Sequence, residues 1–447
     1  MSAQANESAQ HTLARLRSGA LAGATRLDLA HGLTALPPEV FALADTLEVL
    51  NLSGNALSEL PPDFARLSRL RILFCSDNRF TRLPEVLGDC PRLEMVGFKS
   101  NRIAQVPGSA LPPQLRWLIL TGNEIAQLPP ELGERPRLQK LMLAGNRLRH
   151  LPASMAACDR LELLRIASNR IEELPDWLLA LPRLSWLAFG GNPVAQACEA
   201  RAVASYPVPV IDWARLTLHE VLGQGASGVI HRASWRGDDG AERPVAVKLF
   251  KGEITSDGSP MSEMDACTAA GPHPDLIAVR GRIGGHPAGT PGLVLDLISP
   301  TYQSLAGPPS LESCTRDVYA PGQRFSPGSA LAIAGGMASA VRQLHAHGIT
   351  HGDLYAHNIL WDGEHDALLG DFGAASFFDP EGAQAQALQR IEARAFGCLL
   401  EELLQRCEAP DRQLPDALQQ LQQRCLATDA RLRPAFAEID ATLRSLR

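Results

Sequence analysis

The chain has 447 residues, of which 45% are hydrophobic and 20% charged, and its net charge at pH 7 is −7. These values are ordinary for a globular protein of two or three domains, and the negative balance gives no reason to expect nucleic acid as a partner. The nine cysteines form no C-x-x-C pair, which is typical of reduced thiols in the cytoplasm. Since the start of the chain lacks the pattern of a signal peptide and no apolar run is long enough for a membrane span, we expect a cytoplasmic protein.

The first half of the chain is an internal repeat. Asparagines recur every 22 or 23 residues from Asn55 to Asn192, and leucines precede them in the frame L-x-x-L-x-L-x-x-N. A fixed period of this size predicts a solenoid, and the frame resembles a leucine-rich repeat. Each unit is expected to be a short strand with a return segment that buries its leucines against its neighbours. The asparagines are predicted to be scaffold residues that bind backbone groups at the turns.

Two columns of residues are predicted to line the concave face of this solenoid, because they flank the buried leucine of each strand. Both columns are more apolar than a solvated face requires, and contiguous exposed apolar area often marks a binding surface. We therefore predict that this face binds another protein or the chain's own second half. The alternative is that these side chains only cover the sheet. The predicted contact residues are Val49, Ile72, Phe74, Met95, Trp117, Ile119, Met142, Leu163 and Trp186.

The periodicity stops after Asn192, and the sequence of the junction predicts a short helix over 195–204. Pro207 and Pro209 should end this helix, because proline cannot donate a backbone hydrogen bond. The predicted division is an N-terminal extension at 1–24, about seven or eight repeats of 22–24 residues at 25–194, a cap and linker at 195–215, and a second domain at 216–447.

The second domain opens with glycines at 223, 225 and 228 between two predicted strands. Glycines let backbone N–H groups approach phosphates closely, and a following strand, rather than a helix, argues against a dinucleotide-binding loop. The apolar strand Val245-Ala246-Val247-Lys248 comes next. From about residue 216 onward the chain therefore resembles a eukaryotic-type protein kinase domain. The implied fold class is multidomain, an α/β leucine-rich-repeat solenoid followed by an α+β bilobal kinase-like domain.

The resemblance implies a nucleotide site that binds ATP. Lys248 is implied to contact the α- and β-phosphates and to be held by a glutamate of the next helix, for which Glu263 is the choice and Asp265 the alternative. A further helix is predicted from Ser326-Pro327 to His347, because serine followed by proline is a good helix start. The residues implied to bind the nucleotide are Leu222, Gly223, Gly225, Ser227, Gly228, Val229, Ala246, Lys248, Asp296, Leu297, Ile298 and Leu360.

The stretch His-Gly-Asp-Leu-Tyr-Ala-His-Asn at 351–358 is similar to a kinase catalytic loop, and Asp-Phe-Gly follows at 371–373. By this resemblance, Asp353 orients and deprotonates the acceptor hydroxyl, while Asn358 and Asp371 bind Mg²⁺. The loop departs from the common motif at two places. Gly352 replaces an arginine that usually receives a phosphorylated activation loop, and Tyr355 replaces a lysine that usually neutralises the γ-phosphate. His357 is a candidate substitute for that lysine when protonated, which would make activity sensitive to pH near neutrality.

The segment after the Asp-Phe-Gly motif is short and contains no A-P-E sequence. Glu392 stands where the family usually has an aspartate, and is expected at the start of the next large helix. Arg433 resembles the arginine that pairs with the missing glutamate of A-P-E, so we expect it to pair with another group. Since the A-P-E region normally supports the peptide platform, nucleotide binding is better supported than ordinary peptide recognition.

Three functions remain open at this point. The favoured one is an ATP-dependent protein kinase, of the serine/threonine type, whose repeats recruit or sense a protein partner. The second is a nucleotide-binding pseudokinase scaffold, which Tyr355 and the short activation segment favour. The third is a small-molecule phosphotransferase, because aminoglycoside-type kinases also combine His-Gly-Asp with an asparagine five residues on and lack A-P-E.

Overall fold

The structure is a computed structural model that describes residues 11–30, 32–252, 254–408 and 416–446. The chain divides into two compact units. The first comprises the described residues up to Leu164, together with Asn169–Leu181. The second comprises Arg165–Ser168 and the described residues from Pro182 onward. Two short segments of the repeat region therefore belong to the same compact unit as the second domain.

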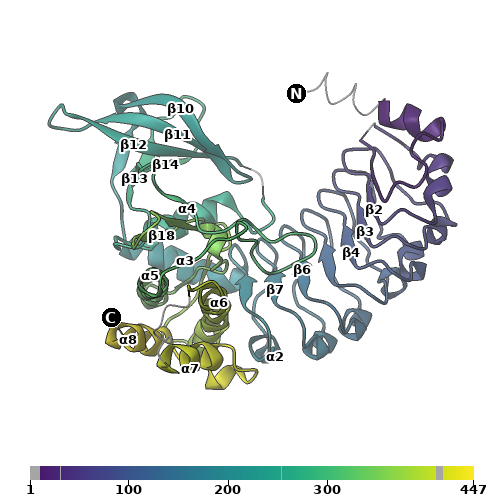
Figure 1. The fold of residues 1–447 in the computed structure, drawn as a ribbon. Coiled ribbons are helices and arrows are strands. Elements are labelled where there is room, and N and C mark those ends of the chain that lie inside the picture. Colours follow the sequence, from purple (N-terminus) through teal and green to yellow (C-terminus); the bar gives the residue numbers. More distant parts are fainter. Residues whose placement is uncertain (1–10, 31, 253, 409–415, 447) are drawn as a thin grey trace. The chain divides into compact units, whose positions relative to one another are not determined.

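Each repeat contributes a three-residue strand and a return segment, in most repeats a 3₁₀ helix (Figure 1). Neighbouring strands pair in parallel and in register, so that equivalent residues of successive repeats lie side by side, as Val49, Ile72 and Met95 do. The middle residue of each strand is buried, so the leucines form a continuous core. The strands are β1 (Arg26–Asp28), β2 (Val49–Asn51), β3 (Ile72–Phe74), β4 (Met95–Gly97), β5 (Trp117–Ile119), β6 (Lys140–Met142), β7 (Leu163–Arg165) and β8 (Trp186–Ala188).

The return segments of the repeats are short helices. Most begin directly after the recurring proline, whose fixed φ suits the first position before a helical turn. They are η1 (Pro38–Leu43), η2 (Phe64–Arg66), η3 (Glu85–Asp89), η4 (Gly108–Ala110), η5 (Pro130–Glu134), η6 (Ala153–Ala157) and α2 (Asp176–Leu179).

The asparagine ladder is scaffold, as predicted. The side-chain Nδ2 of Asn78 donates to the carbonyls of Leu52 at 2.9 Å and Cys75 at 3.1 Å, and its Oδ1 accepts from the backbone N–H of Leu57 at 2.9 Å. Asn101 repeats this arrangement one unit later. Each amide thus links two consecutive turns and satisfies backbone groups that the strand ends leave unpaired.

The predicted concave columns occupy the first and third positions of the strands, but they are less exposed than a free binding face would be. Ile72, Met95, Met142, Leu163 and Trp186 are buried. The half-buried members are Val49, Phe74, Trp117 and Ile119. The burial of Trp186 comes from the second domain, because its ring stacks on Tyr355 with 4.2 Å between the centroids. Four of the nine predicted contact residues remain half-buried.

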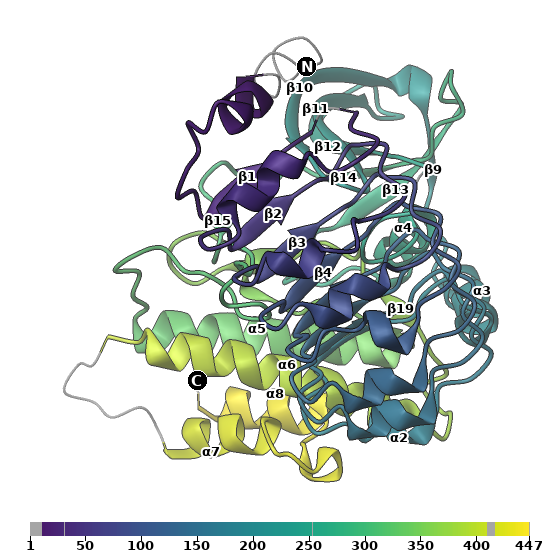
Figure 2. The same ribbon diagram turned by 90° about the vertical axis from the view of Figure 1, so that its right-hand side faces the viewer.

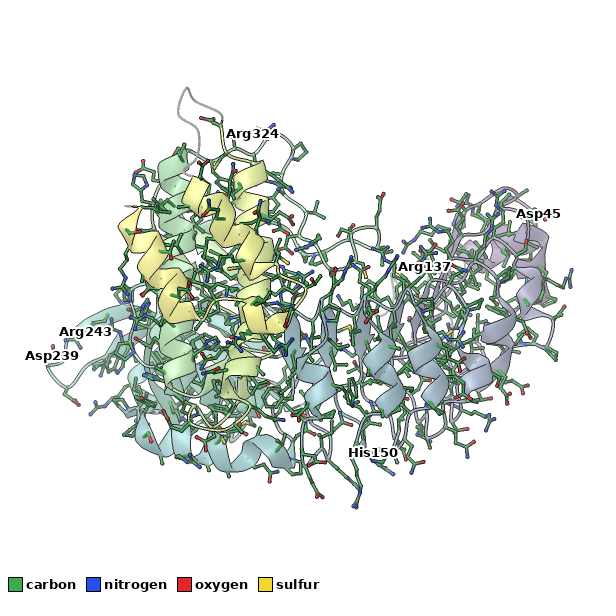
Figure 3. All side chains as sticks on the ribbon, turned by 90° about the horizontal axis from the view of Figure 1, so that it is seen from below. Asp45, Arg137, His150, Asp239, Arg243 and Arg324 are labelled. Atoms are coloured by element: carbon green, nitrogen blue, oxygen red, sulfur yellow. The ribbon has the colours of Figure 1, made fainter. Side chains whose placement is uncertain are left out.

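The second unit contains a six-stranded sheet in the order β10-β11-β12-β14-β13-β9. The strands predicted around the glycine turn and before Lys248 form its antiparallel β10-β11-β12 part. The junction segment after the two prolines adds β9, which pairs in parallel with β13. Asp239 and Arg243, at the tip of the β11-β12 hairpin, form a surface ion pair (Figure 3). The strands are β9 (Val210–Asp212), β10 (Leu216–Gln224), β11 (Gly228–Arg236), β12 (Glu242–Phe250), β13 (Val279–Gly284) and β14 (Gly292–Asp296).

Helices form the other lobe of this unit, and Figure 2 shows α5 and α6 running side by side. The predicted helix start is confirmed, because Ser326 caps α5 by accepting from the backbone N–H of Ser329. The expected start at Glu392 is wrong: α6 begins at Ala385, so that Glu392 lies inside the helix and buried. The helices are α3 (Pro193–Ser205), α4 (Pro260–Ala269), α5 (Pro327–Ala346), α6 (Ala385–Gln405), α7 (Asp416–Cys425) and α8 (Phe436–Ser445).

The smaller elements of this lobe carry the loops between the helices. β15 (Gln303–Ser304), β17 (Ile359–Trp361) and β18 (Ala367–Leu369) form one small sheet, and β16 (Ile349–Thr350) pairs with β19 (Ser376–Phe377). Single 3₁₀ turns lie at η7 (Trp213–Arg215), η8 (Ala356–Asn358) and η9 (Ala430–Leu432). None of the nine cysteines, all of which lie in the described ranges, forms a disulfide. None of the helices in the described ranges is long and apolar enough to cross a membrane.

Candidate phosphoryl-transfer site

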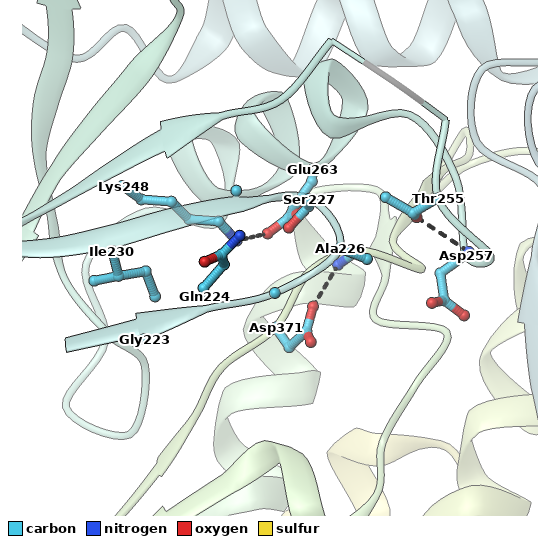
Figure 4. Close-up of a pocket in the computed structure, with 13 residues that line it drawn as sticks. Gly223, Gln224, Ala226, Ser227, Ile230, Lys248, Thr255, Asp257, Glu263 and Asp371 are labelled. Carbon is cyan, nitrogen blue, oxygen red and sulfur yellow. Dashed lines mark hydrogen bonds and ion pairs between the residues drawn. The ribbon is translucent and has the colours of Figure 1, made fainter. Parts of the chain in front are cut away.

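A cleft of about 300 Å³ lies beside the glycine turn in the second unit (Figure 4). It is lined by the turn itself, by Lys248 of β12 and Glu263 of α4, and by Asp371 and Gly373 of the Asp-Phe-Gly stretch. Five predicted nucleotide residues (223, 225, 227, 228 and 248) therefore meet at one cleft. The remaining lining residues, which the sequence did not indicate, are Gln224, Ala226, Ile230, Thr255 and Asp257.

The glycine turn has the open backbone that phosphate binding requires. A Cβ atom added at Gly223 or Gly225 would meet nothing within 4 Å, so the main chain is accessible there. Gly228 has a different role, because a Cβ there would lie 2.4 Å from the carbonyl oxygen of Leu249 on the neighbouring strand. The first two glycines suit a phosphate and the third allows the hairpin to close.

Lys248 and Glu263 form an ion pair at the floor of this cleft. Both side chains are largely buried, at 14% and 1% exposure. Burial raises the pKa of Glu263, with the charge of Lys248 opposing the rise. Burial lowers the pKa of Lys248, but the negative charges around it, Glu263 first among them, together raise it above its usual value. The alternative carboxylate partner for Lys248, Asp265, pairs instead with Arg282 at 2.6 Å, so the geometry favours Glu263.

The catalytic loop holds Asp353 by several hydrogen bonds. The Nδ2 group of Asn358 donates to the backbone carbonyl and to Oδ2 of Asp353, both at 2.9 Å. Glu392 accepts from the backbone N–H of Gly352 at 2.7 Å. From its place inside α6, this glutamate therefore anchors the catalytic loop at the position where the family usually has an aspartate. Burial would raise the pKa of Asp353, but Arg165 and two histidines hold it below its usual value.

Asn358 and Asp371 are the residues implied to bind Mg²⁺, and Asp371 lines the cleft whereas Asn358 does not. Asp371 adopts the left-handed region at φ 52°, and its Oδ1 accepts from the backbone N–H of Gly373 at 3.1 Å. The residue is exposed at the cleft. The amide group of Asn358 donates through Nδ2, which directs its oxygen away from Asp353. Carboxylate and amide oxygens are the donors that Mg²⁺ prefers.

Seven residues implied to bind the nucleotide do not line this cleft. Leu222 is 50% exposed, Asp296 pairs with Arg280 at 2.7 Å, and Leu360 lies opposite Ser304 in the small sheet. The cleft is lined by the glycine turn and Lys248, and these seven residues lie outside it. Their roles stay predictions, and the full set is Leu222, Val229, Ala246, Asp296, Leu297, Ile298 and Leu360.

His357, the candidate substitute cation, is held by a buried carboxylate. Its Nδ1 lies 2.7 Å from Oδ1 of Asp317, and its backbone N–H donates to Oδ2 of the same residue at 3.0 Å. Burial lowers the pKa of His357, but Asp317 outweighs this and raises it above the ordinary histidine value. The charged imidazolium is therefore favoured, and its role in activity stays a prediction.

Repeat residues of the same unit cover the catalytic loop at Gly352 and Tyr355, the side on which the acceptor hydroxyl is expected. Gly352 has φ +71°, and a Cβ there would lie 2.4 Å from the carbonyl oxygen of Ala374 and 2.9 Å from that of Leu187. An arginine cannot occupy this position without moving the backbone. Tyr355 stacks on Trp186 with 4.2 Å between the ring centroids, and the indole N–H of Trp186 donates to the carbonyl of Leu354 at 3.2 Å.

Two further contacts join the last repeat to the helical lobe. Arg433, which we expected to find a substitute partner, donates to the carbonyl of Pro182 at 2.7 Å. The hydroxyl oxygen of Ser376 accepts from the backbone N–H groups of Phe189 and Gly190 at 2.8 and 2.9 Å. Arg433 therefore pairs with the backbone of the last repeat.

Arg165 was not predicted as a site residue. Its side chain is 1% exposed and forms ion pairs with Asp257, at 2.7 Å, and with Asp353. Its Nη1 donates to the carbonyl of Gly352 at 2.9 Å. The sequence signal was a cation in a concave column where the two preceding strands have Ile119 and Met142.

Comparison with known proteins agrees with this architecture. Residues 216–396 match the family model for protein tyrosine and serine/threonine kinases, and residues 23–80 and 136–194 match the leucine-rich repeat. The chain is 30% identical over 178 residues to the serine/threonine-protein kinase PkaB of Streptomyces coelicolor, covering 37% of this chain and 38% of that protein. It is 29% identical over 172 residues to the serine/threonine-protein kinase mos of Xenopus laevis, covering 37% and 43%.

These matches define the class of the chain. It carries leucine-rich repeats followed by a protein kinase domain. It spans less than half of the length of the curated relatives that it matches.

Proposed function

We propose that the chain is an ATP-dependent protein kinase that transfers the γ-phosphate to a protein hydroxyl, of the serine/threonine type. The observation that carries this proposal is the Lys248–Glu263 ion pair beside an open glycine turn and the exposed Asp371, all at one cleft. Kinase chemistry requires these groups together, and a scaffold that bound nucleotide only for stability would not need all of them.

In this mechanism the lysine and the glycine turn hold the phosphates of ATP, and Asp353 accepts the proton of the acceptor hydroxyl. The acceptor oxygen forms a bond to the γ-phosphorus while the bond to the bridging oxygen breaks, and ADP leaves with that electron pair. Asn358 and Asp371 would hold Mg²⁺, which would neutralise charge on the phosphates when bound. Glu392 keeps the catalytic loop in place through the backbone N–H of Gly352.

The second candidate is a nucleotide-binding scaffold. Enclosure of the acceptor side favours it, since Asp353 is only 16% exposed beside Arg165. The two candidates differ in whether phosphate is transferred at all. A small-molecule phosphotransferase is a third outcome of the same test.

The test is to incubate the chain and its Asp371→Ala variant with Mg²⁺ and labelled ATP, and to follow label on the chain, on added proteins and on small molecules. Label on protein that the variant loses supports the kinase. Binding of ATP without transfer supports the scaffold, and label on small molecules alone supports the phosphotransferase.

We also propose that the chain acts in the cytoplasm, where its cysteines stay reduced. The half-buried concave residues Val49, Phe74, Trp117 and Ile119 are proposed to contact a protein partner. If Trp117→Ser changes neither partner capture nor kinase output, this face serves packing alone.

A further inference from the structure

The catalytic loop contains no lysine or arginine between His351 and Asn358. Phosphoryl transfer nevertheless needs its catalytic groups fixed in position, and needs positive charge near the reacting phosphate. Tyr355 is directed to a stacking contact with Trp186, and the backbone of Leu187 and Ala374 fills the space beside Gly352. Any arginine or lysine that serves this loop must therefore come from another segment.

Arg165 lies at this loop. It is the last residue of β7, and its guanidinium uses three N–H groups on three different acceptors. One acceptor is the carboxylate of Asp353, one is the backbone carbonyl of Gly352, and the third is Asp257 in the loop before α4. The arginine thus ties the catalytic loop to a segment that lines the nucleotide cleft.

The contact fixes both oxygens of the Asp353 carboxylate. Oδ1 accepts from Arg165 and Oδ2 accepts from Asn358. A carboxylate has about four lone-pair positions, so an acceptor hydroxyl can still form a hydrogen bond to it. With both oxygens held, the carboxylate cannot rotate about its χ2 angle without losing a charged hydrogen bond.

The burial of Arg165 indicates that it serves more than packing. Its side chain is 1% exposed, and burying a guanidinium costs several kcal/mol unless the charge is paired. The equivalent places in the preceding repeats hold Gly97, Ile119 and Met142, so the repeat fold does not itself require a cation there.

We infer that Arg165 is a positioning residue for phosphoryl transfer, holding Asp353 in the orientation in which it accepts the proton of the acceptor hydroxyl. This inference rests on the proposed kinase function. The opposite reading is that Arg165 blocks Asp353 and keeps the kinase inactive. The next repeat also contacts the helical lobe, through Phe189 with Ser376 and through Pro182 with Arg433, which favours a permanent part of the site over a removable block.

The experiment compares ADP formation from Mg²⁺-ATP by the full-length chain and four variants, which counts transfer to any acceptor, water included. Arg165→Met removes the charge and keeps the length of the side chain, Arg165→Gln keeps a polar donor, and Arg165→Lys keeps the charge. Arg201→Met is the matched control, because Arg201 is 63% exposed and pairs with Asp379 at the surface.

We expect kcat to fall roughly 10²-fold in Arg165→Met and Arg165→Gln, with KM for ATP changed by less than about threefold because the Lys248 cleft is untouched. Arg165→Lys should recover at least about a tenth of the wild-type kcat, and Arg201→Met should match the wild type. If Arg165→Met fails to fold, Arg165→Gln and Arg165→Lys carry the comparison.

Three results would overturn the inference. A higher kcat in the neutral variants means that Arg165 blocks Asp353, and an equal kcat means that Arg165 has no part in the transfer. Loss of kcat together with the thermal midpoint, without rescue by lysine, means that its role is structural. A wild-type chain that binds ATP but forms no ADP refutes the proposed kinase function first, and the inference with it.

Discussion

The two sides of the candidate site are built in different ways. The nucleotide side is made mainly of the glycine turn, one strand and one helix, to which Asp371 and Gly373 are added. Its Lys248 and Glu263 are only 15 residues apart in the sequence. The acceptor side joins the catalytic loop to the last repeats, with Arg165 and Asp353 188 residues apart. Contacts between residues close in the sequence can form without the repeats, whereas the acceptor side depends on the folding of the repeat segments beside it.

The first prediction concerns the nucleotide side and has the largest expected effect. Lys248→Met should lower the rate of phosphoryl transfer roughly 10³-fold, because it removes a charge aimed at the phosphates and leaves Glu263 buried without its partner. Steady-state ADP formation measures the loss. Lys99→Met, a substitution in the repeats, should leave the rate unchanged, and an equal loss in both variants would refute the assignment.

The second prediction concerns the acceptor side. Trp186→Ala should lower the free energy of unfolding by about 3 kcal/mol, because the indole is buried against Tyr355 and its N–H is paired. Trp117→Ala should lower it by only about 1 kcal/mol, since that side chain is half-buried. Denaturant unfolding of both variants decides; similar losses would contradict a special role for the last repeat.

The third prediction tests Arg433, which is 2% exposed and donates to the carbonyls of Ala427 and Pro182. Arg433→Met should destabilise the chain by about 2 kcal/mol, because buried carbonyls lose charged hydrogen bonds. Arg431→Met, two residues away on a side chain that is 84% exposed, provides the control and should unfold like the wild type. An unchanged thermal midpoint in both would show that the contact with Pro182 adds nothing.

The fourth prediction concerns pH. Burial raises the pKa of Glu402 to about 7, with the negative charge of Asp317 adding to the effect. A carboxyl group whose pKa is raised by folding binds its proton more tightly in the native state, so stability is present below the unfolded pKa and is lost as pH rises through the folded value. As pH rises from about 4.5 to 7, the titration of Glu402 should lower the free energy of unfolding by about 1.5 kcal/mol. This value is discounted for the partial exposure of the side chain.

Glu402→Gln isolates that effect, because glutamine keeps a hydrogen-bond acceptor for Tyr319 and does not titrate. Urea unfolding of the wild type and the variant at pH 5 and pH 8 gives the measurement. A wild type that loses no more stability over this range than the variant would exclude Glu402 as the cause.

The sequence predicts well those features that follow local rules. The repeat period, the asparagine ladder, the cap at Ser326 and the pairing of Lys248 with Glu263 all depend on contacts within one or two elements. The acceptor side depends on contacts between distant segments. Nothing in the sequence near Arg165 indicates its ion pair with Asp353, and Gly352 gives only the negative information that an arginine is absent. The start of α6 was misplaced because the stretch before Glu392 has good helix formers that continue the same helix.

Native-state hydrogen exchange tests most directly whether the last repeat belongs to the kinase unit. The amides of Phe189 and Gly190 donate to Ser376, and the amide of Gly352 donates to Glu392. If these groups form one cooperative unit, all three amides should exchange with the same opening free energy and the same dependence on denaturant. Exchange of Phe189 and Gly190 at a free energy more than about 2 kcal/mol below that of Gly352 would show that the repeat segment opens alone, and would contradict the account.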